Sequence, residues 1–369
     1  MTQRLIIHVD LDYFYAQCEE NANPSIRGKP VVVCVYSGRT SESGVVSTSN
    51  YEAREYGVRA GTAIATAKKL LESTNANFLP MNRPFYDAIS RRIMNTLKDH
   101  GDLFEQTSID EAYLDVSERG KGDYNIAKTI ANSIKEIILS QEQITCSIGI
   151  APNKLLAKLA SDNAKPNGLT VLEPEQVHNF LNSLEIGRLP GVGRRVEERL
   201  HASNVKTVDE LSRLSPIALQ EMFGRKLGTY LFLAARGEDT EPVQDKELPT
   251  QMSRIGTLKE NTRDRSLIRP VLSELSRSLT EKLQNERINC RSVAIIAILS
   301  NLSIHTRSRA LETSASDLQT IDDCAQQLLR EFIEGTPEAV LRRVGVKVTG
   351  LSKSSGQMNI ESFFSKVPR

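Results

Sequence analysis

Two acidic residues stand side by side in the segment FEQTSIDEAYLDV, which spans residues 104–116. Asp110 and Glu111 interrupt an alternation of apolar and polar residues that is typical of a half-buried strand. Partial burial makes each ionised carboxylate costly, and the two negative charges also repel each other. A cation or a nearby base relieves such repulsion, and a solvated hairpin corner avoids it. The pair therefore indicates either an exposed turn or a cation-binding site.

A second acidic cluster lies near the N-terminus, in the segment HVDLDYFYAQCEE. Asp10 ends an apolar strand, and Asp12 follows on the same side if the strand continues. If the two predicted strands are neighbours in one sheet, Asp10 lies beside Asp110 and Glu111. Carboxylate oxygens suit hard divalent cations such as Mg²⁺, which share their ligands with substrate phosphates. Two such ions, roughly 3.5–4 Å apart, stabilise the attacking and leaving oxygens of a phosphoryl displacement.

The composition is that of an ordinary globular protein, with 39% hydrophobic and 25% charged residues. At 369 residues the chain is long enough for two or more domains, each with its own core. The formal net charge is +1, so the total charge supplies no field that would attract a polyanion. A nucleic-acid enzyme of this composition must therefore concentrate its basic residues locally.

No apolar stretch reaches the roughly 18 residues that a membrane span needs, and the N-terminal apolar run is too short for a secretory signal. Five cysteines are scattered without a C-x-x-C pair, which argues against a disulfide framework or a zinc site. Cys34, Cys146 and Cys290 lie in or beside apolar stretches and are expected in the core. We therefore expect no membrane association and a reducing, cytoplasmic location.

Strand-like and helix-like segments alternate over residues 1–168 without a regular βαβ rhythm. This order predicts an α+β fold with an antiparallel or mixed sheet at its centre. Ser49 or Asn50 is expected to cap a helix, and Pro166 with Gly168 to end another. We expect strands over 5–10, 29–37 and 145–153, and helices over 85–101, 126–141 and 154–168.

The second half of the chain begins with short helical segments, from about residue 170 to 237. A polar, proline-bearing stretch without periodicity follows and predicts a linker at 238–250. Residues 251–350 then form another globular block. Its strands are expected in SVAIIAILSN and LRRVGVKVTGL, and its helices in SLIRPVLSELSRSLTEKLQ and DDCAQQLLREFIEG.

Four short motifs occur in this order along the chain: VDLDYFYAQ, NYEAR, SIDEAYLD and AKPNG. Their order and spacing resemble the Y-family DNA polymerases of the DinB class, and the likeness covers essentially the whole chain. The resemblance implies a right-hand α+β fold with a palm, small fingers, a helical thumb and a C-terminal little finger. The implied domains are a palm at 1–10 and 80–168, fingers at 11–79, a thumb with a helix-hairpin-helix at 169–237, the linker at 238–250, a little finger at 251–350 and a tail at 351–369.

The resemblance assigns the acidic residues to a catalytic metal site. It makes Asp10, Asp110 and Glu111 the metal ligands, with the backbone carbonyl of Leu11 assisting. Asp12 is expected to orient nearby backbone and not to touch metal. The implied cofactor is a pair of Mg²⁺ ions, with Mn²⁺ as a substitute, and phosphoryl transfer at such a site depends on positioning and charge neutralisation.

Aromatic, hydroxyl and cationic residues are implied to bind the incoming deoxynucleotide. Tyr15 resembles the family's steric gate, an aromatic ring that leaves no room for a ribose 2′-hydroxyl; the alternative is an aromatic residue of the core, which describes Phe14 better. Taken alone, Arg54 and Lys165 would be surface charges on helices. Val35, Val45 and Ser47 resemble the small fingers residues above the nascent base pair. The implied nucleotide-binding set is Tyr13, Phe14, Tyr15, Thr48, Tyr51, Arg54 and Lys165.

Two further regions are expected to hold DNA. LPGVGRRVEERL places Gly191 and Gly193 before an amphipathic helix and resembles the helix-hairpin-helix of the family's thumb. Alternating basic residues, Arg254 early in the little finger and Arg307 with Arg309 later, predict a face that follows the phosphate backbone, because residues two apart on a strand share a face. The alternative is an ordinary solvated surface. Binding through such a face should weaken steeply with salt.

The C-terminal segment QMNIESFF matches the pattern of peptides that dock into sliding clamps of the PCNA type. A short helical turn would place Ile360, Phe363 and Phe364 on one side, with Gln357 making polar contacts. The alternative is a terminal segment whose aromatic residues occur by chance. Docking to a clamp would raise the effective concentration of the enzyme at the primer end.

The sequence thus predicts a monomeric DNA-directed DNA polymerase that extends primers on damaged templates, with primer-template DNA, deoxynucleotides and a PCNA-type clamp as partners. We also expect no proofreading, because no segment remains for an exonuclease. One alternative is another two-metal enzyme on a related palm, such as a nucleotide cyclase, which needs neither the hairpin nor the clamp peptide. The other is a catalytically silent scaffold that binds DNA and the clamp.

Overall fold

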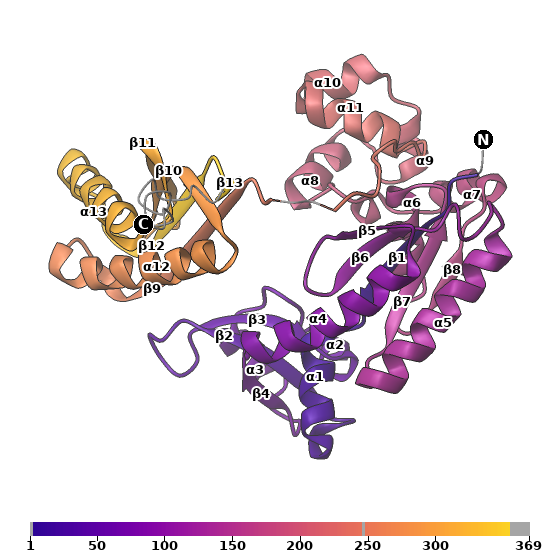
Figure 1. The fold of residues 1–369 in the computed structure, drawn as a ribbon, viewed down its shortest axis with the longest axis horizontal. Coiled ribbons are helices and arrows are strands. Elements are labelled where there is room, and N and C mark those ends of the chain that lie inside the picture. Colours follow the sequence, from indigo (N-terminus) through magenta and orange to yellow (C-terminus); the bar gives the residue numbers. More distant parts are fainter. Residues whose placement is uncertain (1–2, 246–247, 355–369) are drawn as a thin grey trace, which may run out of the picture. The chain divides into compact units, whose positions relative to one another are not determined.

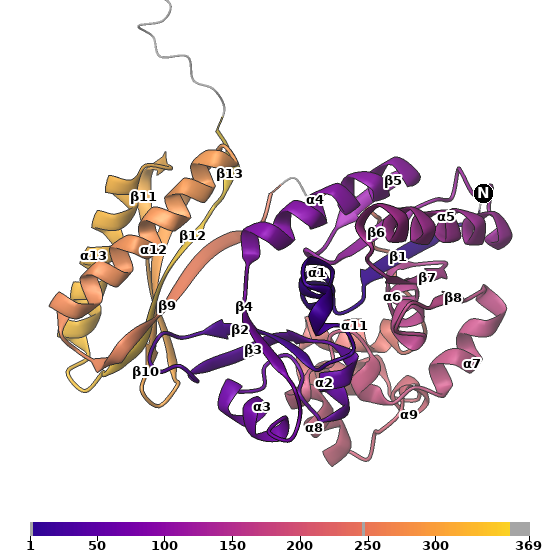
Figure 2. The same cartoon turned by 90° about the horizontal axis from the view of Figure 1, so that it is seen from below.

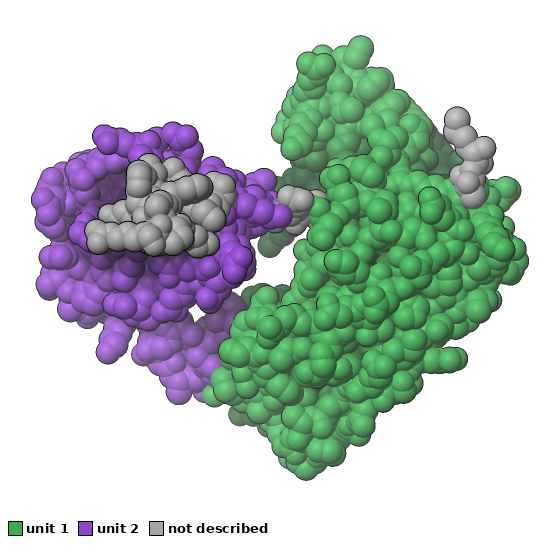
Figure 3. All heavy atoms as spheres, viewed as in Figure 1, with its two compact units in different colours: residues 1–34, 46–62, 66–246 green, residues 35–45, 63–65, 247–369 purple. Residues whose placement is uncertain are grey.

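The computed structural model describes residues 3–245 and 248–354 (Figure 1). The chain forms two compact units, coloured separately in Figure 3. Within the described residues, no helix is both long and apolar enough to cross a bilayer. The first unit comprises residues 1–34, 46–62 and 66–246, and the second comprises residues 35–45, 63–65 and 247–369.

The centre of the first unit is a five-stranded sheet with the order β5-β6-β1-β7-β8. β1 is antiparallel to both of its neighbours, whereas β7 and β8 are parallel, so the predicted mixed sheet is confirmed. Every residue of β1 and β7 is buried, as expected for central strands covered on both faces. The strands are β1 Ile6–Leu11, β5 Leu103–Gln106, β6 Glu111–Asp115, β7 Cys146–Ala151 and β8 Leu169–Val171.

Helices cover this sheet on both faces. Ile7, Val9 and Leu11 of β1 share a core with α4 (Arg83–His100) and α5 (Tyr124–Glu142). Ile6 packs on the opposite face with α6 (Lys154–Asn163). Because side chains alternate along a strand, His8 and Asp10 lie on the α6 face as well. Gly149 of β7 allows α6 to come close, since a Cβ there would lie 2.0 Å from the carbonyl oxygen of Ala157.

The segment predicted as the fingers forms a smaller sheet with the order β3-β2-β4. Asn50, one of two predicted caps, begins α2: its side chain accepts a hydrogen bond from the Ala53 amide at 3.1 Å. Cys34 is buried in this sheet, as Cys146 and Cys290 are in the other two. The elements are α1 Phe14–Ala22, η1 Pro24–Ile26, β2 Val31–Tyr36, β3 Gly44–Ser49, α2 Tyr51–Glu55, α3 Ile64–Leu70 and β4 Asn77–Pro80.

Short helices follow β8, as predicted for the thumb segment. They share one core with α6 and with Ile6 of the central sheet. The described residues after them, 238–245 and 248–250, contain no helix or strand, in agreement with the predicted linker. The helices are η2 Pro174–Gln176, α7 Val177–Asn182, η3 Ile186–Arg188, α8 Arg194–Ala202, α9 Val208–Ser212, α10 Pro216–Phe223 and α11 Arg225–Ala234.

The second unit contains a four-stranded sheet with the order β11-β10-β12-β9. The sheet is antiparallel throughout, and the short β13 (Ser352–Lys353) pairs with the start of β10. α12 and α13 lie side by side on one face and share the core with the sheet (Figure 2). The other elements are β9 Gln251–Thr262, α12 Arg265–Asn285, β10 Ile288–Leu299, β11 Ile304–Ala315, α13 Leu318–Gly335 and β12 Leu341–Thr349.

The end of the predicted thumb and the beginning of the predicted linker are bound to the start of α6 and its N-cap residue. Asn153 donates a hydrogen bond to the carbonyl of Gly237 at 2.7 Å, and Asp239 accepts one from the Leu155 amide at 3.1 Å. Next to these contacts, Lys154 Nζ lies 2.8 Å from Oε2 of Glu105, and both side chains are almost fully buried. A buried ion pair is costly to break, because removal of one partner leaves a desolvated charge.

We therefore expect Lys154→Met to lower the free energy of unfolding by about 3–5 kcal/mol. Replacing both partners, as Lys154→Met with Glu105→Leu, should restore most of that stability, since no buried charge then remains. Arg92→Ala is the control: Arg92 is exposed, pairs with Glu142 at 2.7 Å, and should cost about 1 kcal/mol or less. Urea unfolding measures all three variants. Equal costs for Lys154→Met and Arg92→Ala would contradict a stabilising role for the buried pair.

Candidate active site

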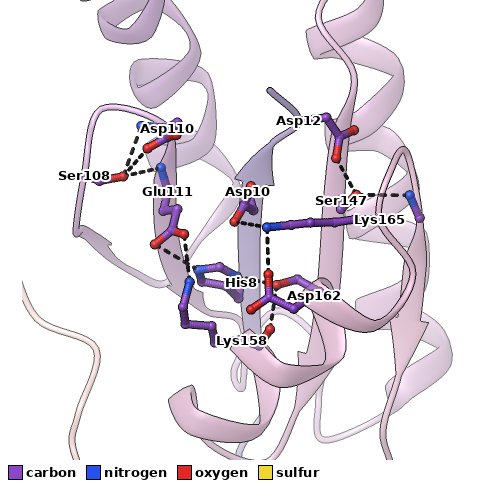
Figure 4. A network of polar contacts seen from close by, with 12 residues as sticks. His8, Asp10, Asp12, Ser108, Asp110, Glu111, Ser147, Lys158, Asp162 and Lys165 are labelled. Carbon is purple, nitrogen blue, oxygen red and sulfur yellow. Dashed lines mark hydrogen bonds and ion pairs between the residues drawn. The ribbon is translucent and has the colours of Figure 1, made fainter. Parts of the chain in front are cut away.

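The register of two strands brings the separate acidic segments together. Asp10 of β1 is the direct partner of Glu111 of β6 in the antiparallel ladder. The Leu11 amide donates to the carbonyl oxygen of Asp110 at 2.9 Å, which extends the pairing beyond the end of β6. The expectation that Asp10 lies beside Asp110 and Glu111 is confirmed (Figure 4).

A tight turn holds Asp110 in front of β6. The Ser108 hydroxyl donates to Oδ1 of Asp110 at 2.5 Å and accepts hydrogen bonds from the amides of Asp110 and Glu111 at 3.2 and 2.9 Å. Ser108 belongs to the SIDEAYLD motif, but sequence reasoning gave it no role. The turn fixes the backbone at the point where the two carboxylates diverge (Figure 4).

Lysines from α6 and the turn after it neutralise these carboxylates. Lys158 Nζ lies 2.7 Å from Oε1 of Glu111, and Lys165 Nζ lies 2.6 Å from Oδ2 of Asp10 and 2.7 Å from Oδ1 of Asp162. Lys165 was predicted to bind the nucleotide, whereas Lys158 and Asp162 were missed. A signal was available, because Lys154, Lys158 and Asp162 recur every four residues and thus share one face of α6.

His8 lies beneath the acidic pair and was also missed. Its side chain is fully buried, its Nδ1 is 2.7 Å from the Ser161 hydroxyl, and its ring centroid is 4.6 Å from that of Tyr113. Nε2 lies 3.9 Å from Oε2 of Glu111, too long for a good hydrogen bond but close enough to favour the charged form of that carboxylate, and it has no other partner among the described residues. Burial lowers the pKa of His8, so the ring is neutral at pH 7.

Burial is the largest single influence on the pKa of each acidic residue, but the net shifts of Asp10 and Glu111 have opposite directions. Burial raises the pKa of Asp10 to about 8, with Glu111 adding to the increase and Lys165 opposing it. Burial acts on Glu111 in the same direction, but contacts with His8 and Lys158 outweigh it and hold the pKa of Glu111 below its usual value. The two lysines therefore do not supply enough positive charge for both carboxylates to ionise freely at neutral pH.

The oxygen-rich donor set fits a hard divalent cation. In the described part of the chain, no three His, Cys, Asp or Glu side chains are gathered closely enough to hold a metal ion. Lys165, Lys158 and Ser108 each engage one of the three carboxylates. Those groups would have to release the carboxylates before a cation could bind.

Asp12 does not join the acidic pair. Its carboxylate accepts hydrogen bonds from the Ser147 and Thr145 hydroxyls at 2.7 and 2.9 Å and from the Asn167 amide at 2.8 Å. β1 ends at Leu11, so the alternation that would have placed Asp12 beside Asp10 does not continue. The expectation that Asp12 orients backbone is supported, since Asn167 belongs to the loop that carries Lys165. Figure 4 shows Asp12 apart from Asp10, beside Ser147.

Three predicted nucleotide-binding residues gather at the starts of α1 and α2. The rings of Tyr13 and Tyr51 meet edge to face at 5.3 Å, and the Arg54 guanidinium lies 4.7 Å from the Tyr51 ring centroid. Burial raises the pKa of Tyr51, and Asp12, Arg54 and Lys165 all lie near enough to affect it. No side chain caps α1, whose backbone amides at Phe14 and Tyr15 therefore favour an anion. Thr48 is half-buried on β3.

Comparisons with known protein families cover most of the chain. Residues 9–162 match the impB/mucB/samB family, residues 249–360 match its C-terminal domain, and residues 187–239 match the thumb domain of DNA polymerase iota. DNA polymerase IV of Nitrosopumilus maritimus is 42% identical over 365 residues, which cover 99% of this chain and 100% of that protein. This chain is a Y-family DNA polymerase. DNA polymerase IV of Methanosarcina acetivorans is 43% identical over 366 residues and 98% of this chain, and 99% of that protein is covered.

Solved structures of the family have the same fold. A Y-family DNA polymerase chimera of Dbh and Dpo4 superposes with a TM-score of 0.88 at 38% identity, covering 95% of this chain and 99% of that one. The insertion ternary complex of Dbh DNA polymerase, also 38% identical and equally covered, gives a TM-score of 0.69. The protein is thus a DNA-directed DNA polymerase of the translesion class, and its family comprises metal-dependent nucleotidyltransferases.

The polymerase presents Tyr15 and Phe14 in different environments, although they are adjacent. Phe14 is 2% exposed and belongs to the core, so only its backbone can face a substrate. Tyr15 is half-buried and stacks on Tyr86 of α4. The core reading therefore applies to Phe14, and the gate assignment of Tyr15 stays a prediction.

Gly191 and Gly193 of the thumb have different structural roles. Gly191 has φ +84°, and a Cβ at this position would lie 2.9 Å from the ring of Tyr230. Gly193 precedes α8 without a side-chain cap, and a Cβ there would meet no atom within 4 Å. The first amides of α8 are therefore accessible to a phosphate, as the hairpin reading predicts.

The structure places the predicted little-finger arginines on an unexpected face. Arg307 and Arg309 share a face as predicted, but they pair across β10 with Ile295 and Val293, which belong to the helix-covered core. Arg309 forms an ion pair with Glu331 of α13 at 2.6 Å. Arg307 is nevertheless exposed and Arg309 half-buried, so the prediction that this pair contacts the phosphate backbone stays a prediction.

Arg254 lies on the helix-covered face too, opposite the buried Val346, with its Nε 3.3 Å from the Ser278 hydroxyl of α12. The open face carries Arg343 and Lys347 of β12, which sequence reasoning missed. Their positions could have been deduced, because the apolar residues Val344, Val346 and Val348 alternate with them. The predicted clamp-binding residues Gln357, Ile360, Phe363 and Phe364 lie outside the described residues.

The hydrogen bonds of Asp12 predict a defect in nucleotide binding. Asp12→Ala removes the acceptor of the Asn167 amide and should loosen the loop of Lys165, raising KM for deoxynucleotides about 10-fold, which corresponds to about 1.4 kcal/mol. Steady-state single-nucleotide insertion measures this change. Glu136→Ala, which removes an exposed carboxylate on α5, should leave KM unchanged. A rise in the Mg²⁺ requirement with an unchanged KM would instead identify Asp12 as a metal ligand.

Proposed function

We propose that this polymerase transfers nucleotides from deoxynucleoside triphosphates to a primer 3′-hydroxyl with two Mg²⁺ ions, and that it does so across damaged template bases. The observation that carries the proposal is the pairing of Asp10 with Glu111 on the α6 face of the sheet. A chain has no structural reason to place two carboxylates opposite each other on a buried face, because like charges in this position destabilise the sheet. A divalent cation removes that cost.

Asp10, Asp110, Glu111 and the carbonyl of Leu11 would hold the cations, which would offset the charge of the triphosphate and lower the pKa of the primer 3′-hydroxyl. The protein contributes positioning and charge. Lys165 pairs with Asp10 and Lys158 with Glu111, and a bound cation would release both lysines to contact a substrate phosphate. Oxygen donors of this kind accept Mg²⁺ and Mn²⁺ alike, so Mn²⁺ should serve as a substitute.

The groups proposed to bind the triphosphate are Tyr13, Tyr51, Arg54 and the first backbone amides of α1. Lys165 would supply a further positive charge to the triphosphate. Arginine suits bidentate phosphate contact and lysine supplies a point charge. Thr48 adds a neutral donor in this proposal. Tyr15, at the first turn of α1, is proposed as the gate against ribonucleotides.

Duplex DNA would be held without sequence readout. The accessible amides of α8 after Gly193 and the cations Arg343 and Lys347 are the groups proposed to meet the phosphates. Binding through so few cations should be modest and salt-sensitive, which is consistent with the net charge of +1. A monomeric state, a cytoplasmic location and the lack of proofreading remain predictions.

The decisive experiment is primer extension with Mg²⁺ and four deoxynucleotides on an intact template and on one with a single abasic site. We expect extension on both. Asp10→Asn and Glu111→Gln should each slow extension by about 1,000-fold, or about 4 kcal/mol, because a cation ligand is lost. The control Glu136→Gln alters an exposed carboxylate on α5 and should retain full activity.

DNA binding, measured by fluorescence anisotropy, should persist in all of these variants. If extension stops at the abasic site, the polymerase activity stands, but the proposal that the enzyme bypasses this lesion is wrong. DNA binding without any extension by the wild-type chain would favour the silent scaffold. Cyclisation of a nucleoside triphosphate without a primer would favour the cyclase.

A separate prediction concerns the C-terminal peptide. Removal of residues 355–369 should leave basal extension unchanged and abolish stimulation by a PCNA-type clamp, because Gln357, Ile360 and the two phenylalanines are lost. Phe363→Ala with Phe364→Ala in the full-length chain should have the same effect, whereas Ser354→Ala should not. Processivity is measured on a primed circular template with and without the clamp. Stimulation that survives the truncation would exclude the clamp-binding reading of this segment.

A further inference from the structure

Tyr15 rests against a second tyrosine that no part of the proposed mechanism uses. Its ring lies parallel to that of Tyr86, with centroids 4.5 Å apart and an interplanar angle of 17°. Tyr86 belongs to α4, and Tyr15 to the first turn of α1. The face of Tyr15 that is turned away from solvent is therefore occupied by an aromatic ring.

Tyr86 has little freedom to move. Its side chain is fully buried, and its hydroxyl donates a hydrogen bond to Oε1 of Glu19 at 2.5 Å. The neighbouring Phe85 ring lies 5.7 Å away. Glu19 is on α1, so this hydrogen bond joins α4 to the same helix that carries Tyr15. A ring fixed at both its face and its hydroxyl acts as a rigid wall.

Arg83 holds the other end of Tyr15. Its Nη1 lies 3.3 Å from the Tyr15 hydroxyl, and its Nε lies 2.8 Å from Oδ1 of Asp87 one turn later on α4. The ion pair with Asp87 keeps the guanidinium oriented along the helix. Tyr15 is thus restrained at its ring by Tyr86 and at its hydroxyl by Arg83.

A steric barrier discriminates only as strongly as it resists displacement. If the aromatic ring could rotate or retreat at low cost, a ribose 2′-hydroxyl would push it aside, and the penalty for the wrong sugar would be small. Packing behind the ring raises that cost, because the ring would have to enter occupied space. The restraint on Tyr15 should therefore determine how large the discrimination is.

We propose that Tyr86, held by Glu19, and Arg83 position Tyr15 and set the selectivity of the polymerase for deoxyribose. The inference rests on the proposed gate function of Tyr15 and extends it to residues that touch no substrate. Tyr86 and Arg83 are positioning residues, and their contribution is measured as a change in sugar selectivity that depends on Tyr15.

The experiment compares kcat/KM for dCTP and CTP opposite a template guanine. Tyr86→Leu removes the stacked ring and should lower the dCTP preference about 10-fold, the upper range of one aromatic pair. Its kcat/KM for dCTP should stay within about threefold of the wild type. Tyr86→Phe keeps the stacked ring but loses the hydrogen bond to Glu19, and it should lower the dCTP preference by a smaller factor, about threefold.

A double-mutant cycle separates positioning from a general effect on the fold. In the Tyr15→Ala background, Tyr86→Leu should cause no further loss of selectivity, because the residue it positions is absent. An equal loss in both backgrounds would overturn the proposal. Arg83→Ala changes an exposed side chain and should lower selectivity about threefold. This variant tests the proposal independently if Tyr86→Leu does not fold.

The outcomes also distinguish failure of this proposal from failure of the proposed gate function of Tyr15. If Tyr15→Ala leaves sugar selectivity unchanged, Tyr15 is not the gate and both proposals fall. If Tyr15→Ala abolishes selectivity while Tyr86→Leu and Arg83→Ala match the wild type, the gate stands and the restraint by α4 is disproved. Both proposals are supported if Tyr86→Leu lowers sugar selectivity in the wild-type background and has no further effect in the Tyr15→Ala background.

Discussion

The site depends on the repulsion between two carboxylates that the antiparallel register of β1 and β6 forces together. Asp10 and Glu111 are direct cross-strand partners on a buried face, where like charges destabilise a sheet and neither charge is fully hydrated. A one-residue slip of β1 would separate the two carboxylates, but it would also turn every side chain of β1 to the other face of the sheet. The compensation has to come from outside the sheet, and in this protein it comes from Lys158 of α6 and from Lys165 in the loop after it.

The position of α6 therefore controls the charge of the site. Gly149 lets the helix lie close to β7, and the segment after the thumb fixes the start of the helix through Asn153 and Asp239. Lys158 and the lysine of the following loop then neutralise the acidic pair. These lysines offset part of the negative charge of the pair, and in the proposed mechanism a bound cation would release them to contact substrate phosphates. The same side chains would then serve both the stability of the site and the binding of substrate.

Sequence reasoning found the acidic pair and missed its surroundings for a physical reason. Two short motifs fix which carboxylates are present, and strand pairing follows from their apolar alternation. The roles of His8 and Ser108 depend on what packs beside them in three dimensions, which no local pattern records. The little-finger arginines illustrate the same limit: spacing by two predicts that Arg307 and Arg309 share a face, but which face the helices cover is decided by the partner strand.

The two sides of α1 combine stability with discrimination. Phe14 enters the core beneath the central sheet, while the adjacent Tyr15 turns toward α4, because successive residues of a helix point about 100° apart. The packing that buries Phe14 also fixes the backbone from which Tyr15 projects. A substitution of Tyr86 or Arg83 on α4 would therefore alter the choice of substrate, although neither residue contacts substrate or metal in the proposed mechanism. In the proposed mechanism, selectivity for the sugar would come from the restraint of Tyr15 by Tyr86 and Arg83 more than from additional contacts to the nucleotide.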